Sequence, residues 1–166
     1  MSKKIYVAYG SNMDEGQMAY RCPDAKIIGK GKVKNFRLMF KGTLPESYAT
    51  IEPEEGLSVP VILWEISAED ERRLDRYEGF PNFYYKRDLT VETSEGEVVG
   101  MAYIMHEKNR LNPPCDHYYA AIYKAYEKFG FDIKILEEAL QFSDRINFNW
   151  GTRENIFNWT IKHGQQ

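Results

Sequence analysis

The sequence predicts an α+β protein in which a curled sheet or small barrel has helices packed against it. Strand-prone segments crowd the first two-thirds of the chain and helical patterns the last third. Strands and helices do not alternate regularly, which argues against a doubly wound parallel sheet. The chain has 166 residues, 43% of them apolar and 14% aromatic, so it can bury a core as one domain. We expect a single domain over residues 1–166, with a C-terminal tail from about residue 144.

The first segment predicts a strand, a short helix and a second strand. Ile5–Tyr9 is apolar and β-prone. A short helix is expected from Asp14 and ends before Pro23, because proline cannot continue a helix. Lys32–Phe40 is rich in Val, Phe and Leu and predicts the second strand.

Proline and glycine punctuate the next segment. Pro45 and the run Glu52–Gly56 indicate loops on either side of a short strand, Tyr48–Ile51. Val59–Ile66 follows as a strongly apolar strand. We therefore expect two separate strands here, joined by a loop.

A helix is expected after Ser67, which is suited to cap it, because acidic residues fill the first turn. It runs to about Tyr77 and is stopped by Gly79 and Pro81. Farther along, Tyr84–Glu92 and the strand Glu97–His106 are separated by the turn Ser-Glu-Gly, which predicts a hairpin.

The last part of the chain is helical in pattern. Apolar and aromatic residues recur at helical spacing from Asp116 until Gly130, and again over Ile133–Phe142. The tail, Asn147–Gln166, is rich in Asn and Trp, and we expect it to be at least partly helical from Glu154.

Charge and cysteine usage exclude several classes of function. The chain has 22 basic and 25 acidic residues, so no nucleic-acid partner is expected. No long apolar run or signal peptide is present, which predicts a cytoplasmic protein without a membrane partner. We expect a monomer or a homodimer. Cys22 and Cys115 are distant and predict free thiols. The three histidines lack metal-ligand spacing, so no metal is expected. Cys115 beside His117 leaves a thiol nucleophile as an alternative.

The run Tyr6–Met13 is the most informative segment, because a strand runs directly into Gly10-Ser11-Asn12. Glycine can turn sharply and approach a ligand closely, and Ser11 and Asn12 can cap a helix. Such a turn leaves backbone N–H groups free to hold an anionic group. The alternative is an ordinary polar turn. The run is too short for a dinucleotide fingerprint and lacks the Gly-Lys-Ser/Thr of a phosphate loop.

A second motif, Leu74–Gly79, places Glu78 at the C-terminal end of a predicted helix. The helix dipole there disfavours a carboxylate, and neighbouring aromatic residues can bury it. Both effects raise the pKa of a carboxyl group toward the range that is useful for proton transfer. The alternative is a solvated acid paired with Arg72, Arg73 or Arg87.

Together these motifs resemble the gamma-glutamylcyclotransferase-like family. The resemblance rests on the segment Tyr-Gly-Ser-Asn-Met, Arg21-Cys22-Pro23, Ala49-Thr50-Ile51 and Leu-Asp-x-x-Glu-Gly in this order, and it covers roughly Ile5 to Gly130. It implies a small mixed β-barrel flanked by helices. It also implies a cytoplasmic transferase or lyase that needs no cofactor and releases 5-oxoproline from a gamma-glutamyl compound.

The resemblance also implies roles for particular residues. Glu78 matches the catalytic glutamate of the family. The residues expected to bind the substrate are Tyr6, Val7, Ala8, Tyr9, Gly10, Ser11, Asn12, Tyr85, Tyr103 and Tyr119. Tyr118 stands beside Tyr119, which leaves open which of the two faces the pocket.

The implied chemistry agrees with the residue types. The substrate's α-amine attacks its own γ-amide carbonyl and expels an amine, and a carboxylate of raised pKa can carry the proton from one nitrogen to the other. Backbone N–H groups at Gly10–Asn12 suit either the substrate carboxylate or the developing oxyanion. The leaving amine stays open. Two other functions remain: a protein that binds or senses a gamma-glutamyl ligand without turnover, and a hydrolase that releases glutamate.

Overall fold

The computed structural model describes residues 2–43 and 46–144 of the chain. Over these residues the elements are β1 (Lys4–Ala8), the 3-10 turn η1 (Ser11–Met13), α1 (Glu15–Arg21), β2 (Lys26–Thr43), β3 (Glu46–Ile66), α2 (Ala68–Glu78), β4 (Tyr84–Thr93), β5 (Gly96–Met105), α3 (Asp116–Phe129) and α4 (Ile133–Ser143). The predicted tail helix from Glu154 and the predicted loop at Pro45 lie outside the described residues.

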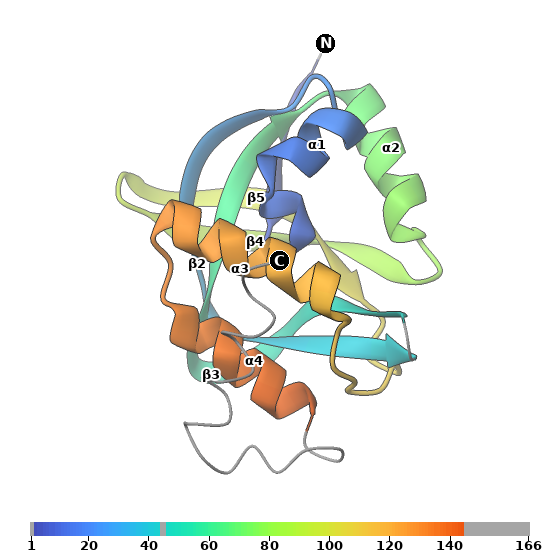
Figure 1. The fold of residues 1–166 in the computed structure, drawn as a ribbon. Coiled ribbons are helices and arrows are strands. Elements are labelled where there is room, and N and C mark those ends of the chain that lie inside the picture. The colour runs from blue at the N-terminus through green and yellow to red at the C-terminus, as the bar shows by residue number, and fades with distance from the viewer. Residues whose placement is uncertain (1, 44–45, 145–166) are drawn as a thin grey trace.

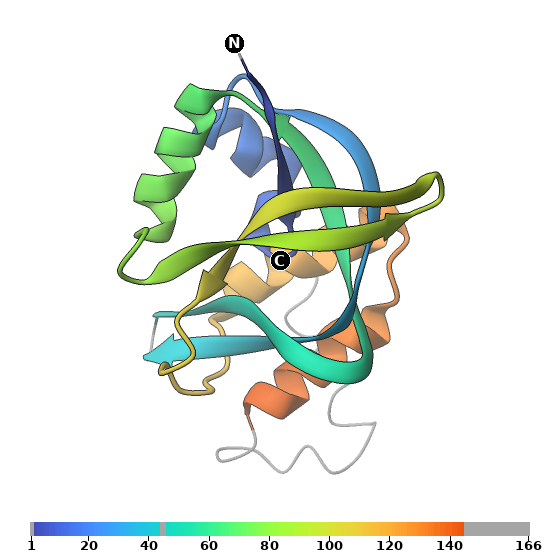
Figure 2. The same ribbon diagram turned by 180° about the vertical axis from the view of Figure 1, so that it is seen from behind.

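The five strands form a closed barrel in the order β1-β3-β2-β4-β5. Neighbouring strands are antiparallel except at one seam, where Tyr6 of β1 pairs in parallel with Met101 of β5. The barrel is therefore mixed. Helices α1, α3 and α4 lie on one side of it (Figure 1), and the β4–β5 hairpin crosses the opposite side (Figure 2). The predicted fold class is confirmed.

The long hairpin of β2 and β3 differs from the prediction. Glu52–Gly56 was expected to be a loop, but it belongs to the continuous strand β3. The ladder accommodates this segment through a bulge, because pairing shifts between Lys34 and Phe36 of β2. Asn35 sits in the bulge with a positive φ of 64°, and its side-chain oxygen accepts a hydrogen bond from the backbone N–H of Gly56 at 3.0 Å. Proline and glycine here bend a strand instead of ending it.

Helix α2 follows the predicted boundaries closely. Ser67 and Asp70 form a reciprocal capping box at its start, and Gly79 ends it in the left-handed conformation, with φ of 66°. Its last helical residue is Glu78. The capping box fixes the start of the helix and Gly79 fixes its end. The position of the Glu78 carboxylate follows from that end.

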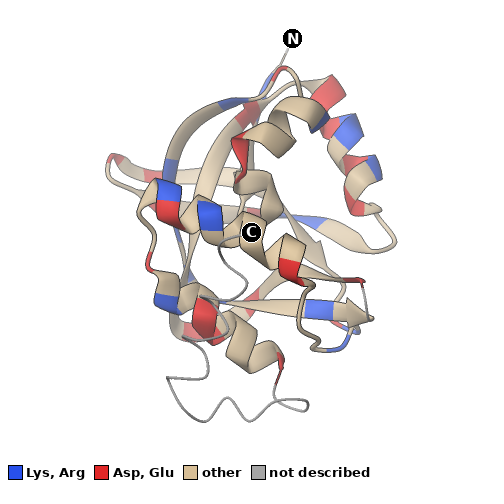
Figure 3. Cartoon of the chain, viewed as in Figure 1, with Lys and Arg blue, Asp and Glu red and all other residues tan. Residues whose placement is uncertain are grey.

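Basic and acidic residues are interspersed along the helices and strands (Figure 3). No helix among the described residues has the length and apolar character that crossing a membrane requires. Within residues 2–43 and 46–144, no three His, Cys, Asp or Glu side chains gather in a metal-binding arrangement.

Candidate active site

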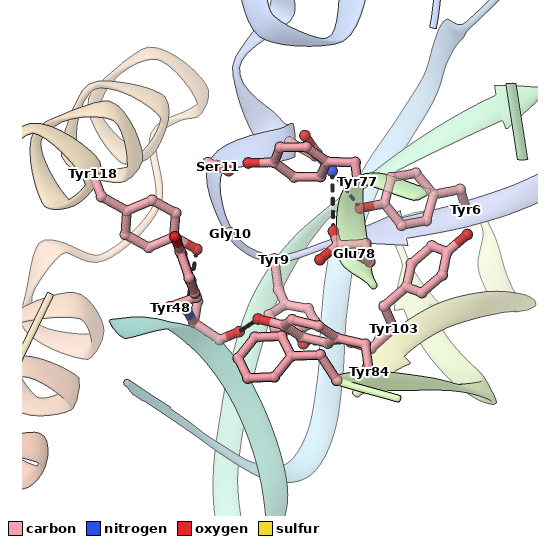
Figure 4. Close-up of a pocket in the computed structure, with 13 residues that line it drawn as sticks. Tyr6, Tyr9, Gly10, Ser11, Tyr48, Tyr77, Glu78, Tyr84, Tyr103 and Tyr118 are labelled. Atoms are coloured by element: carbon pink, nitrogen blue, oxygen red, sulfur yellow. Dashed lines mark hydrogen bonds between the residues drawn. The ribbon is translucent and has the colours of Figure 1, made fainter. Parts of the chain in front are cut away.

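A pocket of about 140 Å³ opens where β1, η1 and the end of α2 meet the barrel and α3 (Figure 4). Seven of its lining residues are tyrosines. The lining consists of Tyr6, Tyr9, Gly10, Ser11, Asn12, Tyr48, Ala49, Tyr77, Glu78, Phe83, Tyr84, Tyr103 and Tyr118. The two sequence motifs, more than sixty positions apart in the chain, therefore face one cavity.

Glu78 is the one charged side chain in this lining. Burial of its carboxyl group raises its pKa to about 7 from an ordinary value of 4.5, and the positive charge of Arg21 partly opposes this rise. Near neutral pH the group is therefore divided between its two protonation states. Such a group can both accept and return a proton.

The alternative of a solvated Glu78 paired with a surface arginine does not match the structure. Arg72 contacts Glu69, and Arg73 lies 3.8 Å from Asp70. The third arginine considered for this role, at position 87, stacks over the ring of Phe36.

Asn12 connects Glu78 to the rest of the site. Its side-chain nitrogen donates to the hydroxyl of Tyr6 at 3.0 Å and to Oε1 of Glu78 at 3.4 Å. Its backbone carbonyl accepts a hydrogen bond from the indole nitrogen of Trp64 at 2.9 Å. Asn12 is thus held from both its backbone and its side chain, and it aims an N–H donor at the carboxylate.

The turn at Gly10 differs in detail from the prediction. Gly10 has a φ of −122°, so its backbone is not left-handed. Proximity favours glycine here, because a Cβ would lie 3.3 Å from both the Cβ of Ala49 and the hydroxyl of Tyr118, which is a tight approach. Ser11 and Asn12 form a 3-10 turn, and the following helix is capped by Asp14 instead.

The pocket tyrosines are anchored by hydrogen bonds. The Tyr84 hydroxyl donates to the carbonyl of Ala49 at 2.8 Å, and the Tyr118 hydroxyl accepts from the N–H of the same residue at 3.0 Å. The Tyr103 hydroxyl donates to Asp75. Burial raises the pKa of all three phenols, so they are neutral at pH 7 and act as polar groups without charge.

Seven predicted site residues line the pocket: Tyr6, Tyr9, Gly10, Ser11, Asn12, Glu78 and Tyr103. Val7 and Ala8 do not, although the prediction extended through them. Both side chains are buried in the core. Adjacent side chains of a strand point to opposite faces, so both faces of β1 are covered at these two positions.

Tyr85 and Tyr119 were also predicted for the pocket, and both lie outside it. Tyr85 points away from the cavity, where its hydroxyl donates to Glu107, and its neighbour Tyr84 occupies the pocket wall. Alternation along a strand sends adjacent side chains to opposite faces, so an error of one residue reverses the assignment. Tyr119 is fully buried against Phe40, and Tyr118 faces the cavity instead.

Six lining residues were not assigned to the site by the sequence reasoning, which left Tyr118 open as the alternative to Tyr119: Tyr48, Ala49, Tyr77, Phe83, Tyr84 and Tyr118. Ala49 and Tyr77 stood inside recognised motifs, so their positions beside the motif residues offered a signal. The others come from β3, β4, α3 and the turn after α2, and only the closure of the barrel brings them together.

Comparisons with known proteins bear on this site. The model of the family described as gamma-glutamyl cyclotransferase, AIG2-like, matches residues 6–121, which is more than half of the chain. The chain belongs to this family. The matched segment contains both motifs and every residue that lines the pocket.

Individual relatives agree with this assignment. The chain is 27% identical over 139 residues to a gamma-glutamylcyclotransferase of Bos taurus, covering 78% of this chain and 73% of the relative. It is 26% identical over 143 residues to the Homo sapiens protein of the same name, with coverage of 81% and 76%. A solved structure titled gamma-glutamyl cyclotransferase superposes with a TM-score of 0.75 at 22% identity, covering 97% of this chain and 99% of the other. This likeness shows the shared fold.

Proposed function

We propose that this chain is an enzyme that releases 5-oxoproline from a gamma-glutamyl compound, with Glu78 as general acid and base. The observation that carries the proposal is the state of Glu78: it is the one charged residue lining the pocket, and its pKa is raised to about 7. Family membership and the relatives named gamma-glutamylcyclotransferase support this type of reaction.

The proposed reaction is an internal acyl transfer. The substrate's α-amine is largely an ammonium at pH 7 and cannot attack until it loses a proton. The Glu78 carboxylate accepts that proton, and the free amine attacks the γ-carbonyl carbon. A new C–N bond closes the five-membered ring, and the original amide C–N bond breaks as Glu78 gives its proton to the leaving nitrogen. The Glu78 carboxylate then takes the second proton that the ring nitrogen loses as it becomes an amide, and passes it to the released amine, which leaves as an ammonium. Atoms and charges balance without any group beyond Glu78.

The pocket has features that suit this reaction. Its small volume and tyrosine walls favour a bent substrate conformer in which amine and carbonyl are close, and such orientation can contribute several kcal/mol to the rate. We assign the backbone N–H groups of Gly10–Asn12 to the substrate carboxylate or the oxyanion. The neutral tyrosine hydroxyls add polar contacts without competing with Glu78 for the proton.

The proposal is tested by incubating purified protein with a panel of gamma-glutamyl amino acids and amines, and identifying products by mass spectrometry. We expect wild type to form 5-oxoproline and Glu78→Gln, which keeps the shape but cannot accept the proton, to be at least about 100-fold slower. Free glutamate as product would indicate a hydrolase. Ligand-induced thermal shifts without turnover across the panel would indicate a binding protein, and full activity of Glu78→Gln would refute the role of this residue.

A further inference from the structure

Arg21, the last residue of α1, lies just outside the pocket lining but contacts two of its residues, Asn12 and Tyr77, and is held by a third contact within α1. Its guanidinium carbon lies 3.7 Å from the centroid of the Tyr77 ring. Its Nη1 donates to the side-chain oxygen of Asn12 and, at 2.9 Å, to the side-chain oxygen of Gln17. A planar guanidinium stacked on a ring and bonded at one end has little freedom to move.

This contact decides which way the Asn12 amide faces. An amide side chain has an acceptor oxygen and a donor nitrogen. With the oxygen bound to Arg21, the nitrogen faces the Glu78 carboxylate and the Tyr6 hydroxyl. The reversed amide would set its nitrogen against a cation and its oxygen against a carboxylate, and both contacts would be repulsive. The positive charge of Arg21 therefore stabilises the orientation in which the Asn12 side-chain nitrogen faces the Glu78 carboxylate.

We propose that Arg21 is a positioning residue for the reaction: it fixes the Asn12 amide so that Glu78 meets a hydrogen-bond donor in the geometry that proton transfer needs. This inference rests on the proposed function and deepens it. It also assigns a role to the arginine of the motif Arg21-Cys22-Pro23, since the end of α1 brings Arg21 into contact with Asn12 and Tyr77.

The other titratable groups around Glu78 do not supply this effect. Those that line the pocket with it are tyrosines from several elements: Tyr6, Tyr9, Tyr48, Tyr77, Tyr84, Tyr103 and Tyr118. On α2 itself, Asp75 is bound to the Tyr103 hydroxyl and to Lys86 at 2.9 Å. Arg21 is thus the cation that acts on Glu78, and it lowers the pKa of that carboxyl group against the effect of burial.

Three variants of the full chain test the proposal. Arg21→Gln removes the charge, Arg21→Lys keeps it, and Arg76→Gln removes a matched charge from the exposed face of α2. For Arg21→Gln we expect kcat for 5-oxoproline release to fall about 10- to 100-fold with a smaller change in KM, because the base is misplaced. The acid limb of the pH profile should also move to higher pH. Arg21→Lys should restore the limb, and Arg76→Gln should match wild type.

A double variant separates positioning from a merely structural role. In the Asn12→Ala background, Arg21→Gln should cause little further loss of kcat, because the effect passes through the missing amide. Equal losses in both backgrounds, or an Arg21→Gln pH profile that coincides with that of Arg76→Gln, would overturn the proposal.

An NMR measurement keeps this test independent of the proposed function. In labelled protein without substrate, the side-chain amide signals of Asn12 should shift and the titration of the Glu78 carboxyl should move to higher pH in Arg21→Gln but not in Arg76→Gln. If wild type releases no 5-oxoproline, the proposed function fails while this measurement still decides the coupling. Unchanged Asn12 signals and an unchanged Glu78 titration would refute the role of Arg21.

Discussion

At the residue scale, the site consists of one ionisable carboxyl group in a wall of neutral hydroxyls. The sequence singled out Glu78 as a carboxylate at a helix end among aromatic residues, with a solvated acid as the alternative, and the resemblance to the family implied its catalytic role. The structure gives the same direction of the pKa shift, with burial as the main cause. Its hydrogen-bond partner Asn12 was also identified, from the turn after β1. Arg21 was quoted only as part of a motif, because its contact with Asn12 depends on how α1 packs against the pocket.

Two neighbouring tyrosines show where prediction from the sequence left a choice open. Tyr118 and Tyr119 are adjacent and chemically identical, and no local signal says which faces the cavity. On a helix, adjacent side chains point about 100° apart, so tertiary packing makes the choice. Tyr118 lines the pocket, and Tyr119 is buried against Phe40.

This difference gives a matched pair of variants. Tyr118→Phe removes the hydroxyl that accepts from the N–H of Ala49, and we expect kcat/KM for 5-oxoproline release to fall about tenfold. Tyr119→Phe should leave kcat/KM within about twofold of wild type, because this hydroxyl lies outside the pocket. Steady-state kinetics on one substrate compares the two. A larger kinetic loss for Tyr119→Phe than for Tyr118→Phe would contradict the pocket as described.

At the element scale, helix caps were predictable and strand continuity was not. Ser67 and Gly79 carry local chemistry that starts and stops a helix wherever it occurs. Glu52–Gly56 carries equally strong turn signals, but Glu52 and Pro53 pair with β2, pairing resumes at Ser58, and the segment stays within strand β3. Long-range hydrogen bonding overrode local propensity there, and a sequence window does not contain that information.

The closure of the barrel between β2 and β4 depends on a glycine. A Cβ at Gly31 would lie 2.4 Å from the backbone oxygen of Glu92, whereas a Cβ at Gly29 on the same strand would meet nothing closer than 4.0 Å. We expect Gly31→Ala to lower the free energy of unfolding by about 1–3 kcal/mol, because the backbone of β2 or β4 must move to make room for the new methyl group. Gly29→Ala should change it by less than about 0.5 kcal/mol. Denaturant unfolding followed by circular dichroism measures both values, and equal stabilities would show that β2 and β4 do not approach as described.

At the scale of the whole molecule, the sequence predicted the fold class and much of the pocket for different reasons. The absence of regular strand and helix alternation excluded a doubly wound sheet, and the closed mixed barrel agrees with this. Glu78 and the pocket residues of the run Tyr6–Met13 were found because each motif is local, whereas Tyr77 of the second motif was not assigned to the site. Tyr48 and Phe83 were not found, because only barrel closure and the seating of the turn after α2 bring them to the motifs.

The partly buried carboxyl group of Glu78 should also cost the molecule stability at high pH. Its pKa is about 7 in the fold against an ordinary value of 4.5, so the folded state holds the proton more tightly than the unfolded state does. Stability is therefore lost as pH rises from about 4.5 through 7, by at most about 3 kcal/mol. Glu78→Gln, which stays neutral, should be more stable than wild type by about 1–3 kcal/mol at pH 8 and nearly equal to it at pH 5.

Denaturant unfolding at the two pH values tests this expectation. Glu69→Gln is the control on the same helix, because Glu69 is exposed and its contact with Arg72 lowers its pKa. This control should gain no stability at pH 8. If Glu78→Gln is no more stable than wild type at pH 8, burial does not destabilise the ionised form of Glu78.

One comparison in wild type decides whether Glu78 is a base with a raised pKa. Two midpoints are compared: that of the acid limb of the pH profile of kcat/KM for 5-oxoproline release, and that of the NMR titration of the Glu78 carboxyl group in the free protein. Because kcat/KM reports groups of the free enzyme, we predict that both midpoints coincide near pH 7. A Glu78 titration near 4.5, with the rate limb at another pH, would show that Glu78 is not the base of raised pKa.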